Sequence, residues 1–225
     1  MQPEERRKLV WLDLCCGLKG ASQPAIDRGW KVICVDIDPR FKPDIVADVR
    51  ALPFRPYRGT LWIEHRRVDV LWASPPCTEF SKFGLRCFYP NPPEPDLSIV
   101  RAIKETLRTF SPRFWCVENV WASRPWLTKI FGPVRARPPG HAIWSNLAFL
   151  LPHIEPHKGK VAGNKRWGPM GHGNDSTNAE WWRKRGKSYV GTGHNGTNAA
   201  EAARIPYEIG EAICRAVEQR QEAVA

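Results

Sequence analysis

The 225-residue chain is long enough for one domain with a hydrophobic core and a small additional region, because 42% of its residues are apolar. Its 34 Lys and Arg residues outnumber its 23 Asp and Glu residues, and the formal net charge of +11 favours a polyanionic partner such as nucleic acid. No segment approaches the ~20 consecutive apolar residues of a membrane span, and the charged stretch from Met1 to Lys8 is unlike a secretory signal. Composition thus excludes an integral membrane protein and leads us to expect a cytoplasmic one.

The seven cysteines are an odd number and include no CxxC pair of the kind that binds zinc. Cys15 and Cys16 are adjacent, which is too close for an ordinary disulfide. We therefore expect free thiols in a reducing compartment and no metal site. Four cysteines occur in apolar or helical segments and are expected in the core: Cys16, Cys34, Cys116 and Cys214.

Strands and helices are expected to alternate along the first 120 residues. The expected strands are short runs rich in apolar residues, at 10–15, 31–36, 45–48, 68–73 and 114–117. The expected helices are at 21–28 and 97–109, the second from apolar residues at helical spacing. Such alternation predicts an α/β fold with a mostly parallel sheet that is covered on both faces.

The composition changes after Pro152. The stretch 143–151 is expected to add a sixth strand or a hairpin, whereas 152–200 is rich in Gly, Asn, His, Lys and Trp and shows little periodicity. Four aliphatic residues then recur at four-residue spacing and predict an amphipathic helix that packs back on the core: Ile205, Ile209, Ile213 and Val217. The expected organisation is a main domain at 1–151, a small irregular region at 152–200 and a terminal helix within 201–225.

A cysteine follows the strand at 68–73, at the end of the strand where open α/β sheets bind their ligands. Ser74, Pro75, Pro76 and Cys77 form a stiff loop there, because proline fixes the backbone and ends the strand. Glu118 follows the next strand, so a thiol and a carboxylate are expected at neighbouring strand ends. Such a pair is suited to covalent catalysis assisted by an acid.

The turn after the first strand has features of a nucleotide-like binding site. Gly17 and Gly20 allow backbone N–H groups to approach a ligand closely. Asp36, at the end of the second strand, is placed to bind ribose hydroxyl groups, and Asp48, after the third, to accept from an adenine amino group. Asp38 is instead expected to cap the helical turn that follows it.

Five segments together resemble the DNA cytosine-C5 methyltransferase family. Segment 13–20 (DLCCGLKG) is similar to the family's first S-adenosylmethionine motif, 35–38 (VDID) to the second and 47–49 (ADV) to the third. Segment 74–81 (SPPCTEFS) resembles the proline-cysteine nucleophile loop, and 118–120 (ENV) the Glu-Asn-Val motif. The resemblance covers roughly 1–151 and the terminal helix, and it implies the Rossmann-like fold of class I S-adenosylmethionine-dependent methyltransferases, with 1–151 as the catalytic domain.

The resemblance also implies a chemistry. Cys77, as a thiolate, would add to C6 of a flipped-out cytosine, so that C5 can attack the methyl group of S-adenosylmethionine. Glu118 would stabilise ring N3, and Arg137, with Arg135 as second candidate, would hold O2. The cysteine needs a lowered pKa, for which a basic pocket or a helix N-terminus is the usual cause. The implied cofactor-binding residues are Asp13, Leu14, Cys15, Gly17, Leu18, Asp36, Ile37, Asp48, Val49 and Pro75.

The short region at 152–200 takes the place of the family's target-recognition domain and is expected to contact nucleic acid. Its segment WWRKRGK offers cations for phosphates and tryptophans that stack on bases; an exposed turn with both tryptophans packed on the core is an equal alternative. The expected nucleic-acid-binding residues are Ser81, Arg135, Trp181, Trp182, Arg183, Lys184, Arg185 and Lys187. The implied partner is duplex DNA in a bacterial, archaeal or phage-infected cell, where DNA methylation serves restriction–modification or its evasion.

Some positions depart from the family pattern. Cys15 replaces an aromatic residue and Lys19 a glycine in the first motif, and the Gly-Asn of the final motif is absent before the terminal helix. Two alternatives stay open: C5 methylation of cytosine in RNA, which a compact recognition region also suits, and a homologue that binds cofactor and nucleic acid without turnover. Retention of Cys77 and Glu118 favours an enzyme. We expect a monomer.

Overall fold

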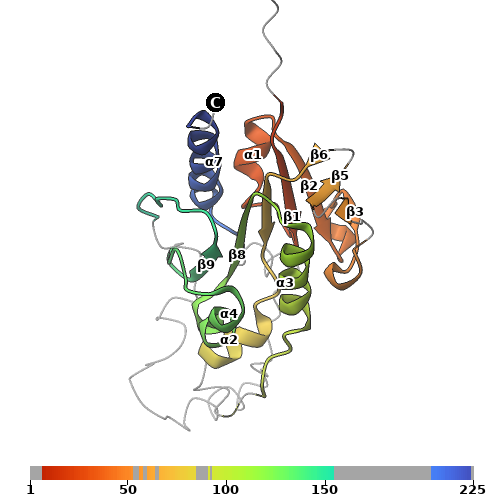
Figure 1. Cartoon of the computed structure of the whole chain (residues 1–225). Coiled ribbons are helices and arrows are strands. Elements are labelled where there is room, and N and C mark those ends of the chain that lie inside the picture. The colour runs from red at the N-terminus through yellow and green to blue at the C-terminus, as the bar shows by residue number, and fades with distance from the viewer. Residues whose placement is uncertain are drawn as a thin grey trace, which may run out of the picture.

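The computed structural model describes residues 7–52, 56–57, 60–63, 66–84, 91, 93–154 and 204–223. A six-stranded sheet forms its centre, in the order β3-β2-β1-β7-β8-β9, with β9 antiparallel and the other five strands parallel (Figure 1). The bounds are β1 Val10–Leu14, β2 Lys31–Asp36, β3 Ile45–Val46, β7 Val70–Ala73, β8 Phe114–Val120 and β9 His141–Ser145. The predicted Rossmann-like α/β fold is confirmed.

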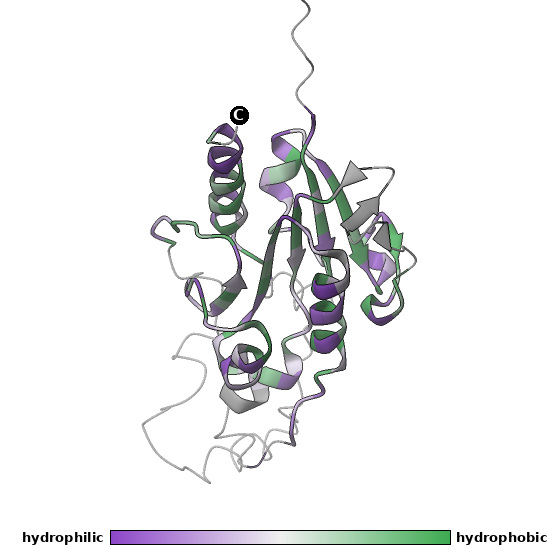
Figure 2. Cartoon of the chain, viewed as in Figure 1, coloured by the Kyte–Doolittle hydropathy of each residue, from purple (hydrophilic) through white to green (hydrophobic). Residues whose placement is uncertain are grey.

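Helices cover both faces of the sheet (Figure 1). Residues of α3 (Ser98–Phe110) and α4 (Arg124–Phe131) pack with Leu12 and Leu71 on one face, and residues of α7 (Tyr207–Glu222) pack with Trp11 and Trp72 on the other. The short helix α1 (Gln23–Asp27) lies on the same face as α7. Successive strand residues therefore bury alternate faces, so β1 and β7 are apolar almost throughout (Figure 2).

Several elements go beyond the sequence-based expectations. These are α2 (Thr78–Gly84), the 3₁₀ turns η1 (Pro39–Phe41), η2 (Val49–Ala51) and η3 (Trp121–Ser123), and a small antiparallel sheet of β4 (Pro56–Tyr57), β5 (Thr60–Ile63) and β6 (Arg66–Arg67). Asp38 caps η1 as predicted, because its side chain accepts a hydrogen bond from the backbone N–H of Arg40 at 2.9 Å.

Strand boundaries differ from expectation around Glu118. Strand β8 continues through Val120 instead of ending before the carboxylate, because β9 pairs with its last residues: Glu118 lies opposite Ile143 and Val120 opposite His141. Strand β9 begins two residues earlier than expected and ends at Ser145. Glu118 is thus held inside a paired strand, which restricts its backbone more than a loop would.

The four cysteines that were expected in the core are found there. Cys16, Cys34, Cys116 and Cys214 are buried in the core and carry free thiols. No group of three or more metal-ligating side chains occurs in the part of the chain that the structure describes. None of the helices described there is long and apolar enough to cross a membrane.

Helix α7 approaches the backbone of the first βα connection through a glycine. A Cβ atom added at Gly210 would lie 2.1 Å from the backbone oxygen of Ala21 and 3.0 Å from Cγ of Pro24. In a helix with free space, Gly→Ala stabilises by about 1 kcal/mol. Here we expect Gly210→Ala to destabilise the fold by roughly 1–3 kcal/mol, the range for overpacking, because α7 must move away from Ala21.

Urea unfolding followed by circular dichroism measures this change. Glu208→Ala, at an exposed position on the same helix, is the matched control and is expected to stay within ~0.5 kcal/mol of the unmodified protein. A Gly210→Ala protein of equal or greater stability would contradict the close approach of α7.

Candidate functional site

A pocket of about 370 Å³ lies at the carboxyl ends of β1, β2 and β7. Its walls come from the turn after β1, the end of β2, the segments before η1 and η2, the loop after β7, α3, and the segment that enters α7. The lining residues are Asp13, Cys15, Cys16, Gly17, Leu18, Gly20, Ala21, Val35, Asp36, Ile37, Asp38, Phe41, Ala47, Asp48, Val49, Arg50, Trp72, Ser74, Pro76, Ile99, Arg204 and Ile205. The location agrees with the carboxyl-end rule for open α/β sheets.

The turn after β1 is shaped by left-handed backbone conformations and held by Asp36. Cys15, Gly17 and Lys19 have φ angles of 58°, 46° and 59°. The Asp36 carboxylate accepts one hydrogen bond from the backbone N–H of Gly17 and one from that of Asp38, each at 2.9 Å. Each carboxylate oxygen keeps a further lone pair, so Asp36 can fix the turn and still accept from a ligand hydroxyl group.

Asp13 presents an unpartnered acceptor at the pocket wall. Its side chain is 1% exposed, and Oδ2 accepts a hydrogen bond of 2.6 Å from the Ser22 hydroxyl group. Oδ1 is fully buried and has no hydrogen-bond partner in the described structure. Burial, with a smaller contribution from the Asp36 charge, raises the pKa of Asp13 from 3.8 to about 7 despite the hydrogen bond from Ser22.

This raised pKa predicts a pH dependence of stability. A carboxyl group with a higher pKa in the folded state binds its proton more tightly there, so its stabilising contribution is complete below pH ~4 and is lost as the pH rises towards ~7. The ligand-free protein is expected to lose up to ~4 kcal/mol over this window through Asp13. Asp13→Asn, which cannot ionise, should remove this part of the pH dependence.

Urea unfolding of both proteins at pH 5 and pH 8 measures the difference. Glu208→Gln, an exposed carboxyl group on α7, is the control and should leave the pH dependence unchanged. Parallel stability curves for Asp13→Asn and the unmodified protein would overturn the assignment of a buried, protonatable Asp13.

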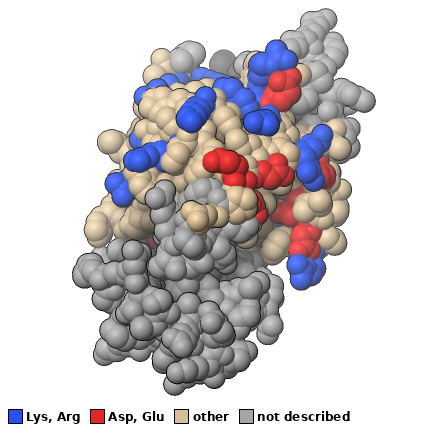
Figure 3. Space-filling view, turned by 90° about the horizontal axis from the view of Figure 1, so that it is seen from below, with Lys and Arg blue, Asp and Glu red and all other residues tan. Residues whose placement is uncertain are grey.

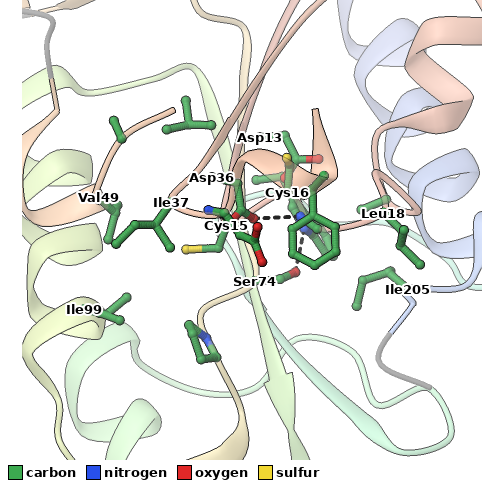
Figure 4. Close-up of a pocket in the computed structure, with 18 of the residues that line it drawn as sticks. Asp13, Cys15, Cys16, Leu18, Asp36, Ile37, Val49, Ser74, Ile99 and Ile205 are labelled. Atoms are coloured by element: carbon green, nitrogen blue, oxygen red, sulfur yellow. Dashed lines mark hydrogen bonds between the residues drawn. The ribbon is translucent and has the colours of Figure 1, made fainter. Parts of the chain in front are cut away.

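The apolar walls of the pocket lie on two sides of Asp36 (Figure 4). Ile37, Val49 and Ile99 form one side, and Ile205 lies on the other. Ile37 is 64% exposed although it is aliphatic, so it offers an uncovered apolar surface beside the acidic centre. The pocket thus combines an apolar slot, suited to a flat ring, with acceptors suited to hydroxyl groups and amines.

Asp48 lines the pocket and is hydrogen-bonded to Arg50. Its carboxylate accepts from the backbone N–H of Arg50 at 2.9 Å and from the guanidinium of Arg50 at 2.6 Å, and these bonds hold the Asp48 pKa below its usual range. The carboxylate lines the pocket, but its acceptor capacity is shared with Arg50. An adenine amino group would have to compete with that guanidinium.

Eight of the ten predicted cofactor residues line the pocket, and Leu14 and Pro75 do not. Leu14 is fully buried and points into the core beneath α3, because its strand alternates faces. Pro75 is buried, whereas Pro76 is exposed and forms part of the wall. Arg204 and Ile205 line the pocket from the far end of the chain, and only the predicted packing of the terminal helix pointed towards them.

The nucleophile candidate Cys77 directly precedes α2. The backbone N–H and the hydroxyl group of Ser81 both donate to the Cys77 carbonyl oxygen, at 2.9 Å and 3.0 Å, and start the helix. The thiol is half-buried. Burial, together with the nearby Glu118 charge, raises the pKa of Cys77 although the Ser81 hydrogen bond lowers it. The expectation of a lowered thiol pKa is therefore wrong for the ligand-free structure.

Asn119 ties the two catalytic candidates together. Its side-chain amide donates a hydrogen bond of 2.8 Å to the backbone oxygen of Pro75, and the residue is 1% exposed. Strand β8 is thereby fastened to the loop that carries Cys77, in addition to the parallel pairing of β7 with β8. The sequence analysis assigned Asn119 no role; its only signal was its place between Glu118 and Val120 in the motif.

Glu118 has a histidine partner that the sequence analysis missed. Oε1 of Glu118 lies 2.6 Å from Nδ1 of His141, with the two side chains 7% and 19% exposed. His141 is the first residue of β9, and the antiparallel register with β8 brings it beside Glu118. No local pattern around residue 141 indicated this pairing, because it arises between segments 23 residues apart.

The two candidate arginines lie on the short segment that pairs with β9. Arg135 donates from Nε to the Ser145 carbonyl oxygen at 3.3 Å, and Cζ of Arg137 lies 3.9 Å from the ring centroid of Trp121. Arg124 approaches the same indole, at 4.6 Å. Both predicted arginines are exposed, so contact with a base by either one stays a prediction.

Most of the predicted nucleic-acid-binding residues lie outside the described residues: Trp181, Trp182, Arg183, Lys184, Arg185 and Lys187. Ser81 is described, and its hydroxyl group is engaged with the Cys77 carbonyl oxygen. In the view from below, Asp and Glu side chains gather among Lys and Arg side chains over the described part of the surface (Figure 3). The visible part of that face carries charges of both signs.

No protein-family model matches the chain, and no curated protein matches it. Among solved structures, a proposed DNA modification methyltransferase encoded within an E. coli prophage matches at 17% identity and a TM-score of 0.41, over 61% of this chain and 46% of that one. Entamoeba histolytica methyltransferase EhMeth matches at 15% and 0.37, over 55% and 42%. The glycopeptide N-methyltransferase MtfA, complexed with S-adenosyl-L-methionine, matches at 12% and 0.28, over 67% of each chain. The chain spans less than half the length of the first two structures, and the likeness is one of fold.

Proposed function

We propose that the protein transfers the methyl group of S-adenosylmethionine to C5 of cytosine in DNA, through a covalent bond between Cys77 and C6 of the base. The observation that carries this proposal is the convergence of Cys77 and Glu118. Cys77 follows β7, Glu118 lies near the carboxyl end of the neighbouring parallel strand β8 and is close enough to raise the pKa of the Cys77 thiol, and Asn119 fastens the two segments together. A pure binding protein would need neither a thiol nor a carboxylate at this place.

The pocket beside Cys77 fits the cofactor. Asp36 would accept from the ribose hydroxyl groups, the slot of Ile37, Val49 and Ile99 would hold the adenine ring, and the free Oδ1 of Asp13 would accept from the ammonium group. The buried, unpartnered Oδ1 supports this fit, since a cationic donor there would satisfy an acceptor that otherwise costs free energy. When bound, the cofactor supplies an electrophilic methyl group.

The chemistry of the chain's own residues follows from these positions. Cytosine C5 is a poor nucleophile until the Cys77 thiolate adds to C6 and interrupts the aromatic ring. The C5=C6 electron pair then moves towards N3, where a proton from Glu118 neutralises the developing charge. C5 becomes enamine-like and attacks the methyl carbon, and the bond from that carbon to the cofactor's sulfur breaks with its electron pair on sulfur. A base such as water then takes the C5 proton, the Cys77–C6 bond breaks to release the thiolate, and N3 returns its proton to Glu118.

The target base must leave the duplex to reach Cys77, because C6 is covered by base stacking. The net charge of +11 and the basic segment 181–187 support a polyanionic substrate. Trp121 with Arg124 and Arg137 adds a cationic, aromatic surface next to the Glu118 strand end. We place the reaction in the cytoplasm of a prokaryotic or phage-infected cell and expect a monomer to perform it.

The test uses tritiated S-adenosylmethionine with tRNA and with two DNA duplexes, one normal and one in which 5-fluorocytosine replaces cytosine. Fluorine at C5 blocks the final proton removal, so the covalent complex accumulates. Label in the normal duplex, together with a denaturation-resistant protein–DNA adduct on the fluorinated one, is the expected result. Label in tRNA but not in DNA would favour the RNA alternative, and cofactor binding without either product would favour a binding homologue.

A further inference from the structure

The hydrogen bond between Glu118 and His141 has a consequence for how the acid works. We infer that His141 is the positioning residue of the reaction: it orients the Glu118 carboxyl group, whose proton is delivered to the base. This inference rests on the proposed function, because it assigns His141 a role through Glu118. Neither residue type nor spacing in the sequence pointed to it.

The geometry leaves one carboxyl oxygen for the substrate. Nδ1 of His141 lies 2.6 Å from Oε1 of Glu118, and within the described structure Oε2 has no hydrogen-bond partner. The pair is fixed from both sides, because β8 is paired with β7 and with β9, and the adjacent Ala142 and Ile143 are fully buried. Rotation of the Glu118 carboxyl group would break a bond between two largely buried side chains.

The backbone supports the position of His141. Its N–H donates to the Pro138 carbonyl oxygen at 3.0 Å, which closes the turn before β9. Gly140 in that turn has a φ angle of 81°, a conformation that other residues rarely adopt. His141 therefore enters β9 from a rigid turn instead of from a mobile loop, so its ring can hold a fixed direction towards Glu118.

The proton balance of the pair is simple. In the reactive form, the proton is on Oε2 and the Nδ1–H group of a neutral imidazole donates to Oε1. As the Cys77–C6 bond forms, the Oε2–H bond breaks and an N3–H bond forms, so Glu118 becomes a carboxylate. The bond from Nδ1–H then becomes charge-assisted and strengthens, which stabilises the transition state more than the ground state.

Charged and titratable side chains near the pair have other roles. Cys77, which directly precedes α2, carries the thiol whose pKa the Glu118 charge raises, and it needs the opposite state, a lost proton. Of the cations nearby, Arg135 binds the Ser145 carbonyl oxygen and Arg137 stacks on Trp121.

The experiment compares two variants of the full chain over pH 5.5–9 in single-turnover methyl transfer. His141→Asn keeps an N–H donor near the place of Nδ1 but cannot hold a proton, whereas His141→Phe keeps the ring size and loses the donor. We expect His141→Phe to slow transfer roughly 100-fold at all pH values, within the range for general acid–base groups. His141→Asn should lose less than ~10-fold, because its amide N–H can still orient Oε1 of Glu118.

Two controls separate this role from a structural one. His153→Asn removes an exposed histidine outside the site and should leave the profile unchanged. Cofactor affinity should be unchanged in both His141 variants, since the pocket does not include this residue. Equal losses in His141→Asn and His141→Phe, or a rate within threefold for His141→Phe, would overturn the inference.

A measurement without substrate distinguishes failure of this inference from failure of the proposed function. A short hydrogen bond between Nδ1–H and a carboxyl oxygen gives a downfield proton resonance in NMR spectra. We expect this resonance in the unmodified protein and its loss in Glu118→Gln. If no nucleic acid is methylated but the resonance is present, the proposed function fails and the pair remains; if transfer occurs and the resonance is absent, the inference about His141 fails alone.

Discussion

Cys77→Ala is expected to abolish methyl transfer, with a rate at least ~1000-fold below that of the unmodified protein. Without a thiolate at C6 the ring stays aromatic, and C5 cannot attack the methyl group. The covalent complex with the fluorinated duplex should disappear as well. Cofactor affinity should stay the same, because Cys77 does not line the pocket. Tritium transfer, a denaturing gel and a cofactor titration measure these three quantities.

Cys87→Ser is the matched thiol control for this experiment. It removes a cysteine ten residues further along the chain, to which neither motif nor chemistry assigns a role, and should keep both activity and adduct. Methyl transfer by Cys77→Ala within tenfold of the unmodified rate would contradict the assignment of the nucleophile.

The raised pKa of the Cys77 thiol predicts how the rate of methyl transfer depends on pH. Burial keeps Cys77 mostly protonated at neutral pH in the ligand-free protein. The rate should therefore rise with pH through the neutral range, as the fraction of Cys77 that is a thiolate grows.

Glu118→Gln is expected to slow transfer by a factor of 10² to 10⁴, the range for removal of a general acid. Glutamine keeps the volume and can still hydrogen-bond the base, but it cannot release a proton to N3 as charge develops there. The fold should tolerate the change, because the side chain fills the same buried space. Single-turnover transfer at saturating cofactor measures the loss.

Glu105→Gln serves as the control for this second experiment. Its carboxylate is exposed on α3 and paired with Arg108, away from the pocket, so the rate should not change. A Glu118→Gln rate within tenfold of that of the unmodified protein would mean that N3 is neutralised by another group.

The parts of the fold that could be predicted are those with a local signal. Strand β2 matches its expected bounds, because an apolar run ends there in an acid. Helix α4 also had such a signal, since Leu127 and Phe131 recur at helical spacing and Gly132 follows with a φ angle of 89°, but the sequence analysis did not use it. Helix α1 is shorter than expected because Ser22 is turned to Asp13.

The residues of the site also divide into those with a local sequence signal and those without one. Cys77, Glu118 and Asp36 could be located because each lies at or near the carboxyl end of a strand, and parallel strands bring these ends to one edge of the sheet. His141 and Arg204 could not be located from the sequence. The place of His141 depends on the antiparallel register of β8 with β9, and that of Arg204 on how the C-terminal segment packs against the pocket. The thiol pKa was missed for a different reason: burial depends on packing around the loop, which no motif encodes.

The segment that leads into α7 packs against the turn after β1, so the pocket is completed only late in synthesis. Gly20 lies so close to Ile205 that an added Cβ would be 2.4 Å from its backbone oxygen, and Arg204 and Ile205 close one wall of the pocket. A ribosome-bound chain that ends before residue 204 has the acids and the nucleophile but an incomplete pocket. One face of its sheet, including Trp11 and Trp72, still lacks α7. The nascent protein should therefore be a client for chaperones, and cofactor should protect it from proteolysis only after α7 has emerged.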